Sequence, residues 1–159
     1  MGQHYYYVLN LDNIGLRFTY VYGSGRARGL KRAILLTKDL IEKPALGEKI
    51  VVPHGDSTLN WLYVKDAATA VISACYAENI EHRIFNIGGE AAKVRKAVDY
   101  LKTLLPDANI DLGQGEEYPG AKMLFDISRA QCEIGYEPSY TLEKGIKEYI
   151  NVVCKKAAR

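Results

Sequence analysis

The sequence predicts an α/β protein built on a parallel sheet, and three observations favour this fold class. Short apolar segments of strand character alternate along the chain with segments whose apolar residues recur at helical spacing. Two strand segments, residues 14–22 and 83–88, are long and apolar enough to lie in the centre of a sheet. A parallel sheet that is buried on both faces needs more strands than these two. We therefore expect residues 1–159 to form one domain that is part of a larger α/β fold.

The first elements alternate between helix and strand. Residues 1–9 are typical of the end of a helix. Residues 14–22 (IGLRFTYVY) have the β-branched and aromatic composition of a strand, and a Gly-Ser-Gly turn ends it. A helix over about 29–42 follows, and Pro44 and Gly47 are expected to close it.

The middle of the chain predicts a short strand over 50–55 and a helix after the segment 61–66. The apolar face of this helix repeats at i, i+3, i+4, i+7 and i+8, namely Ala67, Ala70, Val71, Ala74 and Cys75. Asp66 is the natural N-cap for it. Residues 83–89 (RIFNIGG) then predict an apolar strand that ends in glycines.

The last third of the chain predicts three helices and two short strands. The first of these helices carries one apolar stripe and stops at Pro106; the stripe consists of Val94, Ala97, Val98, Leu101, Leu104 and Leu105. Short strands are expected near 109–112 and 122–125, followed by a brief helix capped by Asp126. The final helix begins at Thr141, with Leu142, Ile146, Tyr149, Ile150 and Val153 facing inward.

Composition and charge exclude several classes of protein. The net charge of +2 and a pI near 8.3 are too mild for a nucleic-acid-binding domain. No apolar run approaches the roughly 18 residues of a membrane span, and the N-terminus has no signal-peptide core. Cys75, Cys132 and Cys154 have neither metal-ligand spacing nor a disulfide framework. These features predict a cytoplasmic protein with no metal site and no nucleic-acid or membrane partner.

Residues 16–29 (LRFTYVYGSGRARG) form the strongest candidate for a binding site. They bring tyrosines to the end of an apolar strand, and α/β folds bind ligands at the carboxyl ends of parallel strands. An ordinary junction of strand and turn explains the same local pattern. The basic cluster that follows indicates either a solvated helix start or an anionic partner; it comprises Arg26, Arg28, Lys31 and Arg32. His54 follows a proline and is either a surface residue or part of a site.

Motifs that would assign chemistry directly are missing. The chain contains no GxGxxG fingerprint, P-loop, nucleophile elbow or HExxH sequence. The glycines of residues 86–90 (NIGGE) follow a strand but do not form a dinucleotide fingerprint. We therefore assign no catalytic residue.

Four stretches in order resemble the extended short-chain dehydrogenase/reductase family, which includes NAD-dependent sugar epimerases and dehydratases. The stretches are LRFTYVYG, WLYVKDAATAVISA, IFNIGG and FDISRAQCEIGYEPSYTLEKGI. The last one is similar to the C-terminal signature of the family through Asp126, Ser128, Arg129, Gly135, Tyr136, Pro138 and Gly145. The resemblance implies the last strands of a Rossmann-type parallel sheet together with a small C-terminal substrate-binding lobe.

The resemblance also implies where ligands bind. Thr19, Tyr20 and Val21 would line the nicotinamide side of the cleft, and the substrate side would comprise Tyr22, Arg26, Arg28 and His54. The glycine-rich βα turn of the family (GxxGxxG) is missing, and its Tyr-x-x-x-Lys pair is expected to be absent as well, because Tyr5, Tyr6 and Tyr7 lack a lysine four residues later. We therefore expect the C-terminal half of an enzyme that uses NAD or NADP when intact, with no cofactor bound by this chain alone. The expected partner is the missing N-terminal half or a second copy of the chain.

Departures from the family pattern bear on the substrate. Many members that act on nucleotide-linked sugars carry phosphate-binding or nucleotide-binding residues where this chain has Tyr20, Leu59 and residues 118–121. Because this chain lacks those phosphate-binding and nucleotide-binding residues, we expect its substrate to be a sugar-like small molecule or a hydroxy acid. Two alternatives stay open: a non-catalytic binding or assembly module built from the same lobe, and an inactive fragment.

Overall fold

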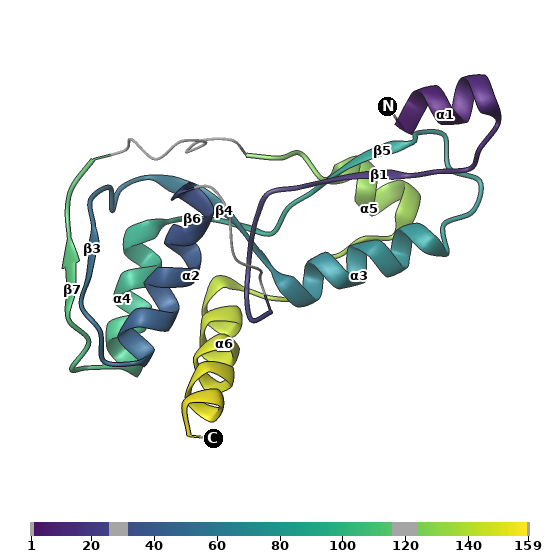
Figure 1. Ribbon diagram of the computed structural model, residues 1–159. Coiled ribbons are helices and arrows are strands. Elements are labelled where there is room, and N and C mark those ends of the chain that lie inside the picture. The colour runs from purple at the N-terminus through teal and green to yellow at the C-terminus, as the bar shows by residue number, and fades with distance from the viewer. Residues whose placement is uncertain (1, 26–31, 116–123, 159) are drawn as a thin grey trace.

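The computed structural model describes residues 2–25, 32–115 and 124–158. Within these ranges it is an α/β structure with helices against several short strands (Figure 1). The helices are α1 (Gly2–Leu9), α2 (Arg32–Ala45), α3 (Val64–Cys75), α4 (Val94–Leu104), α5 (Ser128–Ile134) and α6 (Leu142–Ala157). The strands are β1 (Gly15–Phe18), β2 (Tyr20–Tyr22), β3 (Ile50–Val52), β4 (Thr58–Tyr63), β5 (Ile84–Ile87), β6 (Glu90–Lys93) and β7 (Ile110–Leu112).

The strands form three small sheets. β1 pairs with β5, and β3 pairs with β7, both in parallel. The third sheet has the order β2-β4-β6, in which β2 is parallel and β6 antiparallel to β4. In Figure 1 the β1–β5 pair, with α3 and α5, lies on one side of the molecule and the β3–β7 pair on the other. The parallel pairs confirm the predicted fold class.

The prediction of one continuous strand over 14–22 is wrong, because the chain changes sheets at Thr19. β1 pairs with β5, whereas β2 pairs with β4. At the change, the Thr19 backbone N–H donates to the Ile87 carbonyl at 3.1 Å, and the Thr19 hydroxyl donates to Asn60 Oδ1 at 3.2 Å. A strand that switches sheets bends at the switch, and an apolar run in the sequence does not indicate which partner each half will take.

Several other elements differ from the predictions. β3 ends at Val52, before the expected residue 55, and β4 was not expected as a strand. β6 was not expected, since its sequence EAAK has no strand pattern, yet it pairs with β4 after the glycines at 88–89. α2 continues through Pro44 to Ala45. The strand expected near 122–125 lies partly outside the described residues, and its described part, Leu124 and Phe125, is not a strand.

Helix starts test the predicted caps. The Thr141 hydroxyl accepts from the Lys144 backbone N–H at 3.2 Å, which confirms the start of α6. The Asp126 carboxylate accepts from the Ser128 N–H at 2.9 Å and so binds the first residue of α5, but the N-cap of this helix is Ile127 rather than the predicted Asp126. The prediction for Asp66 is wrong, because Asp66 lies inside the first turn of α3 and the N-cap of that helix is Tyr63.

The carboxylate of Asp66 instead joins two distant segments. It is buried and accepts three hydrogen bonds of 3.0 Å, from the Ser139 N–H, the Ser139 hydroxyl and the Tyr140 N–H. A buried carboxylate is stable only when its acceptor sites are satisfied. Asp66 therefore fixes the segment that leads into α6 against the start of α3.

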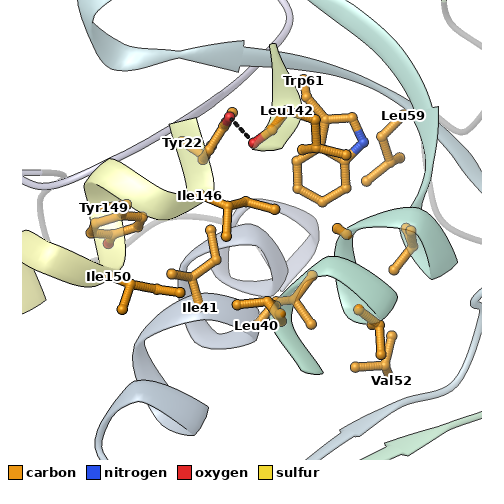
Figure 2. Close-up of a cluster of buried hydrophobic side chains, with 14 of the residues drawn as sticks. Tyr22, Leu40, Ile41, Val52, Leu59, Trp61, Leu142, Ile146, Tyr149 and Ile150 are labelled. Atoms are coloured by element: carbon orange, nitrogen blue, oxygen red, sulfur yellow. Dashed lines mark hydrogen bonds between the residues drawn. The ribbon is translucent and has the colours of Figure 1, made fainter. Parts of the chain in front are cut away.

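The buried apolar residues form two clusters. The large cluster packs α2, α4 and α6 around Trp61, and Figure 2 shows its centre; its members include Tyr22, Leu40, Ile41, Val52, Leu59, Trp61, Leu101, Leu142, Ile146, Tyr149 and Ile150. The small cluster packs α3 and α5 against the β1–β5 pair; its buried members are Leu62, Ala70, Ala74, Phe85, Ile87, Ala130, Ile134 and Tyr136. No helix in the described part of the chain is long and apolar enough to cross a membrane.

Candidate functional site

A cavity of about 300 Å³ lies at the carboxyl end of β2. Its lining comprises Val21, Tyr22, Gly23, Ser24, Gly25 and Val64. This is the end of a parallel strand at which α/β folds present ligand sites. The structure thus brings one residue of the predicted cofactor set, Val21, and one of the predicted substrate set, Tyr22, to a single cavity.

The turn that forms this cavity needs glycine at position 23. Gly23 has φ +135°, a backbone angle that residues other than glycine rarely adopt. A Cβ at this position would also overlap the Val64 side chain. The chain can therefore turn tightly over the start of α3. The glycines that end the predicted strand thus shape the cavity.

Tyr22 is a core residue as well as a wall of the cavity. Its side chain is 2% exposed, and its hydroxyl donates to the Leu142 carbonyl at 3.3 Å (Figure 2). Burial, followed by the nearby Tyr63 and acidic groups, raises the pKa of Tyr22 well above its ordinary value. The phenol stays protonated and bonded to the protein, so the predicted substrate role of Tyr22 stays a prediction.

The three residues predicted for the cofactor lie at and after the sheet change, and each is half-buried. Tyr20 packs against the large cluster, while Val21 packs against the small one, as expected for successive residues of a strand. Burial raises the pKa of Tyr20. Thr19 is held by Asn60, as described above. These positions are compatible with a cleft wall, and the cofactor role of all three stays a prediction.

Of the remaining predicted substrate residues, the structure describes His54 alone, and it does not place His54 in this cavity. His54 follows β3, where its carbonyl accepts from the Ser57 N–H at 3.3 Å. Its ring lies beside Gly115, just after β7, and it is not among the described residues that line the β2 cavity. Arg26 and Arg28 lie outside the described residues.

A second cavity of about 340 Å³ was not predicted. It is lined by Arg17, Ile84, Asn86, Asp126, Ser128 and Arg129. Ile84 and Asn86 alternate along β5 with Phe85 and Ile87 of the small cluster, so this cavity lies on the opposite face of the β1–β5 pair. Hydrogen bonds from Ser128 lower the pKa of Asp126, and the positive charge of Arg129 lowers it further.

The Tyr-x-x-x-Lys spacing does occur later in the chain, which corrects its expected absence. Tyr118 and Lys122 lie outside the described residues. The Tyr140 hydroxyl donates to Glu148 at 2.9 Å, whereas the Lys144 ammonium donates to the Ser139 carbonyl at 3.0 Å and lies over the Tyr140 ring. An acid/base tyrosine needs its lysine near the phenol oxygen. The Tyr140–Lys144 pair is therefore not a catalytic arrangement.

Glu148 organises the polar groups around this pair. Besides Tyr140, it accepts from the Tyr63 hydroxyl at 3.1 Å and pairs with the Lys65 ammonium at 2.6 Å. The hydrogen bond from Lys65 is the main reason that the pKa of Glu148 lies below its ordinary value. Burial and Glu148 together raise the pKa of Tyr63. The cluster joins α3 to α6, and the pKa shifts of Glu148 and Tyr63 move both groups further from titration near neutral pH.

Asn60 was missed by the sequence analysis. It is 4% exposed, and its Oδ1 accepts both from Thr19 and from the Gly89 N–H, at 3.2 and 2.8 Å. The signal in the sequence is one asparagine inside the apolar run LNWLY.

Among the residues that the structure describes, no three His, Cys, Asp or Glu side chains gather in a way that could hold a metal ion.

The parallel α/β architecture, with a cavity at the carboxyl end of a strand, defines an α/β protein of the Rossmann-like class. Comparison with known proteins assigns the family. The sequence profile of the NAD dependent epimerase/dehydratase family matches residues 4–88, more than half of the chain. The chain therefore belongs to the NAD dependent epimerase/dehydratase family.

Individual relatives extend the likeness over the rest of the chain. The dTDP-4-dehydro-6-deoxyglucose reductase of Escherichia coli is 27% identical over 157 residues, which cover 92% of this chain and 47% of the reductase. The chain spans about half the length of the curated relatives it matches.

Solved structures share the fold at lower identity. The UDP-glucuronic acid 4-epimerase of Bacillus cereus, in complex with UDP-glucuronic acid and NAD, is 21% identical with a TM-score of 0.78; the match covers 97% of this chain and 49% of the epimerase. The L-threonine 3-dehydrogenase of Trypanosoma brucei is 15% identical with a TM-score of 0.80, over 96% of this chain and 49% of the dehydrogenase. In each case the likeness covers about half of the longer protein.

Proposed function

We propose that the chain is the substrate-side part of an NAD(P)-dependent epimerase/dehydratase-like oxidoreductase. Its substrate is a small hydroxyl-bearing molecule, either a sugar-like compound or a hydroxy acid, rather than a nucleotide-linked sugar. The observation that carries this proposal is the β2 cavity, which is small and whose described lining contains no charged side chain. Its size is at the lower end of the range of ligand pockets.

The surroundings of Leu59 support the choice of a small substrate. Where the resemblance leads one to expect a phosphate-binding arginine, Leu59 is 1% exposed and packs in the large cluster. A buried leucine supplies none of the charge-assisted hydrogen bonds that phosphate recognition uses. The similar proteins span both substrate classes, since one is named for a dTDP-sugar, another for UDP-glucuronic acid and a third for L-threonine.

The residues present fit only part of a dinucleotide site. Thr19, Tyr20 and Val21 follow the carboxyl end of β1, and Val21 also lines the β2 cavity. No GxxGxxG turn occurs anywhere in the sequence, so the chain offers no glycine-rich cradle for a pyrophosphate. We therefore expect the purified chain to show no NAD(P)H turnover and no tight NAD(P) binding by calorimetry. Steady turnover by the chain alone would contradict the proposal.

The substrate class is tested by thermal shift on the chain supplied with a dinucleotide-binding N-terminal half, in the presence of NAD(P). We expect free sugars, sugar acids or hydroxy acids to stabilise this protein more than UDP- or dTDP-sugars. Stabilisation by the nucleotide sugars alone would overturn the proposed substrate class.

NAD(P)H formation, measured on the same protein, separates this proposal from a binding or assembly module. For such a module, a ligand or partner would stabilise the protein, but oxidation of a hydroxyl would not be coupled to NAD(P)H formation. Arg26→Ala and Arg28→Ala add a finer test. If these arginines bind a carboxylate, each change should weaken acidic ligands more than neutral ones. Equal effects on both would remove their proposed role.

A further inference from the structure

Two segments of the chain cross between the same two sheets. The first is the bend at Thr19, which leads from β1 to β2, and the second is the turn at Gly88 and Gly89, which leads from β5 to β6. β1 and β5 pair with each other, and β2 and β6 lie on opposite edges of β4. Both crossings therefore pass the same point of β4.

Asn60 occupies that point. One oxygen, Asn60 Oδ1, accepts from the Thr19 hydroxyl of the first crossing and from the Gly89 N–H of the second. The neighbours of Asn60 along β4 are apolar and at most 1% exposed, namely Leu59, Trp61 and Leu62. A buried amide in such a strand costs free energy unless it is hydrogen-bonded. Its two bonds offset that cost and make both crossings depend on one side chain.

Further contacts fix the second crossing, so that its position is well defined. The Tyr136 hydroxyl, which is buried, donates to the Gly88 carbonyl at 2.8 Å. The Thr19 backbone N–H also bonds to Ile87, the last residue before this turn. Thr19 is therefore tied to the second crossing twice, once directly and once through Asn60.

We propose that Asn60 is a positioning residue, whose side-chain oxygen sets the course of residues 19–21 by tying Thr19 to Gly89. The consequence for ligand binding rests on the function proposed above, in which residues 19–21 form the nicotinamide wall. The geometric part of the proposal concerns hydrogen bonds within the chain and can be tested without any ligand.

The test is amide hydrogen exchange, resolved by residue, on the purified chain. Asn60→Ala removes the shared acceptor, and Asn60→Asp keeps an oxygen in the same place. We expect Asn60→Ala to speed exchange at Gly89 by about 10-fold or more, because the Gly89 N–H loses its buried acceptor. Exchange at Thr19 should rise less, because the Thr19 N–H keeps its bond to Ile87 and only the Thr19 hydroxyl loses its partner. Asn60→Asp should restore most of the protection, and Asn151→Ala, an exposed asparagine of α6, should leave it unchanged.

A purely structural role predicts a different pattern. Global destabilisation would speed exchange in α4 and α6 as much as at the crossings, and that result would overturn the proposal, as would unchanged exchange at Thr19 and Gly89. Thr19→Val keeps the test usable if Asn60→Ala does not fold. It removes one of the two bonds, so exchange should rise at residues 19–21 while Gly89 stays protected.

The ligand readout is separate. In the longer protein used for the thermal-shift experiment, Asn60→Ala should raise the KM or Kd for NAD(P) at least several-fold, and Asn60→Asp should recover it. If that protein binds no NAD(P), the proposed function fails, while the exchange pattern still decides the role of Asn60. If NAD(P) binds equally well to Asn60→Ala, the positioning role fails while the proposed function stands.

Discussion

The two hydrophobic clusters differ in how completely the chain encloses them. The large cluster is wrapped by α2, α4 and α6, and its central Trp61 is 1% exposed. The small cluster rests on a two-stranded sheet, and apolar side chains of α3 close to it remain exposed, among them Val71 at 45% and Ile72 at 58%. The contrast teaches that helices enclose one core on several sides, while the other core leaves apolar side chains of the neighbouring helix in contact with solvent.

The largest expected effect comes from emptying the large cluster. Trp61→Ala deletes a buried ring and leaves the Ala92 carbonyl, which now accepts from the indole at 3.0 Å, without its donor. We expect the free energy of unfolding to fall by about 3–5 kcal/mol, measured by urea denaturation followed by circular dichroism. Tyr76→Ala is the control, since that side chain is 83% exposed and its loss should cost less than about 0.5 kcal/mol. Similar losses for both variants would contradict the central place of Trp61.

The next prediction uncouples the two clusters. Asp66 belongs to α3, beside the small cluster, and its partners Ser139 and Tyr140 lead into α6 of the large cluster. Asp66→Ala should lower the free energy of unfolding by about 3 kcal/mol, because three hydrogen bonds to a buried carboxylate are lost. Trp61 is the single tryptophan, so its fluorescence reports on the large cluster alone. We expect fluorescence and circular dichroism to give coincident transitions in the original chain and separate ones in the variant. Coincident transitions in both would show that Asp66 is not the tie.

A smaller effect is expected at the start of α6. Thr141→Ala removes the hydroxyl that caps this helix through Lys144, and a lost N-cap costs about 1 kcal/mol. Thr141→Ser should recover most of the stability in the same urea titration. Thr103→Ala is a suitable control, since its hydroxyl bonds only to the Tyr100 carbonyl on the exposed side of α4. A larger loss at Thr103 than at Thr141 would refute the capping role.

The smallest effect is a dependence on acid pH. Lys65, Tyr140 and Tyr63 hold the pKa of Glu148 below its ordinary value, so the folded state favours the ionised carboxylate. The resulting stabilisation is complete above the ordinary glutamate pKa of about 4.3 and is lost as pH falls through the lower, folded value. Since the Glu148 side chain is 31% exposed, the contribution should stay below about 1 kcal/mol. Glu148→Gln should flatten the loss of stability between neutral and acid pH, whereas Glu78→Gln on the surface should not. An unchanged slope in Glu148→Gln would rule out this source.

Local patterns predicted what depends on local chemistry. The apolar stripe of α4 and the inward face of α6 lie where helical spacing placed them, and Thr141 caps α6 as expected. The strand-to-glycine junction at Gly23 does form a cavity at the end of a parallel strand. In each case, the local structure is determined by residues that are close to one another in the sequence.

What the sequence did not predict depends on partners far away in the chain. The break at Thr19 reflects a change of strand partner between β5 and β4, which no periodicity within 14–22 records. Asp66 stands in the sequence where a helix N-cap is expected, but its carboxylate accepts hydrogen bonds from Ser139 and Tyr140, which are more than 70 residues away in the chain. Asn60 carried only the weak signal of a polar residue in an apolar run.

The contact between Tyr22 and α6 also limits which amino-acid substitutions this sequence can accept in evolution. A Cβ at Gly145 would overlap the Tyr22 hydroxyl, so the helix keeps a glycine at a buried position where alanine would favour helix by about 1 kcal/mol. Alanine at 145 becomes acceptable only after a smaller residue has replaced Tyr22. That first step would empty part of the core and remove the bond to Leu142. Descendants of this sequence should therefore change both positions together or neither.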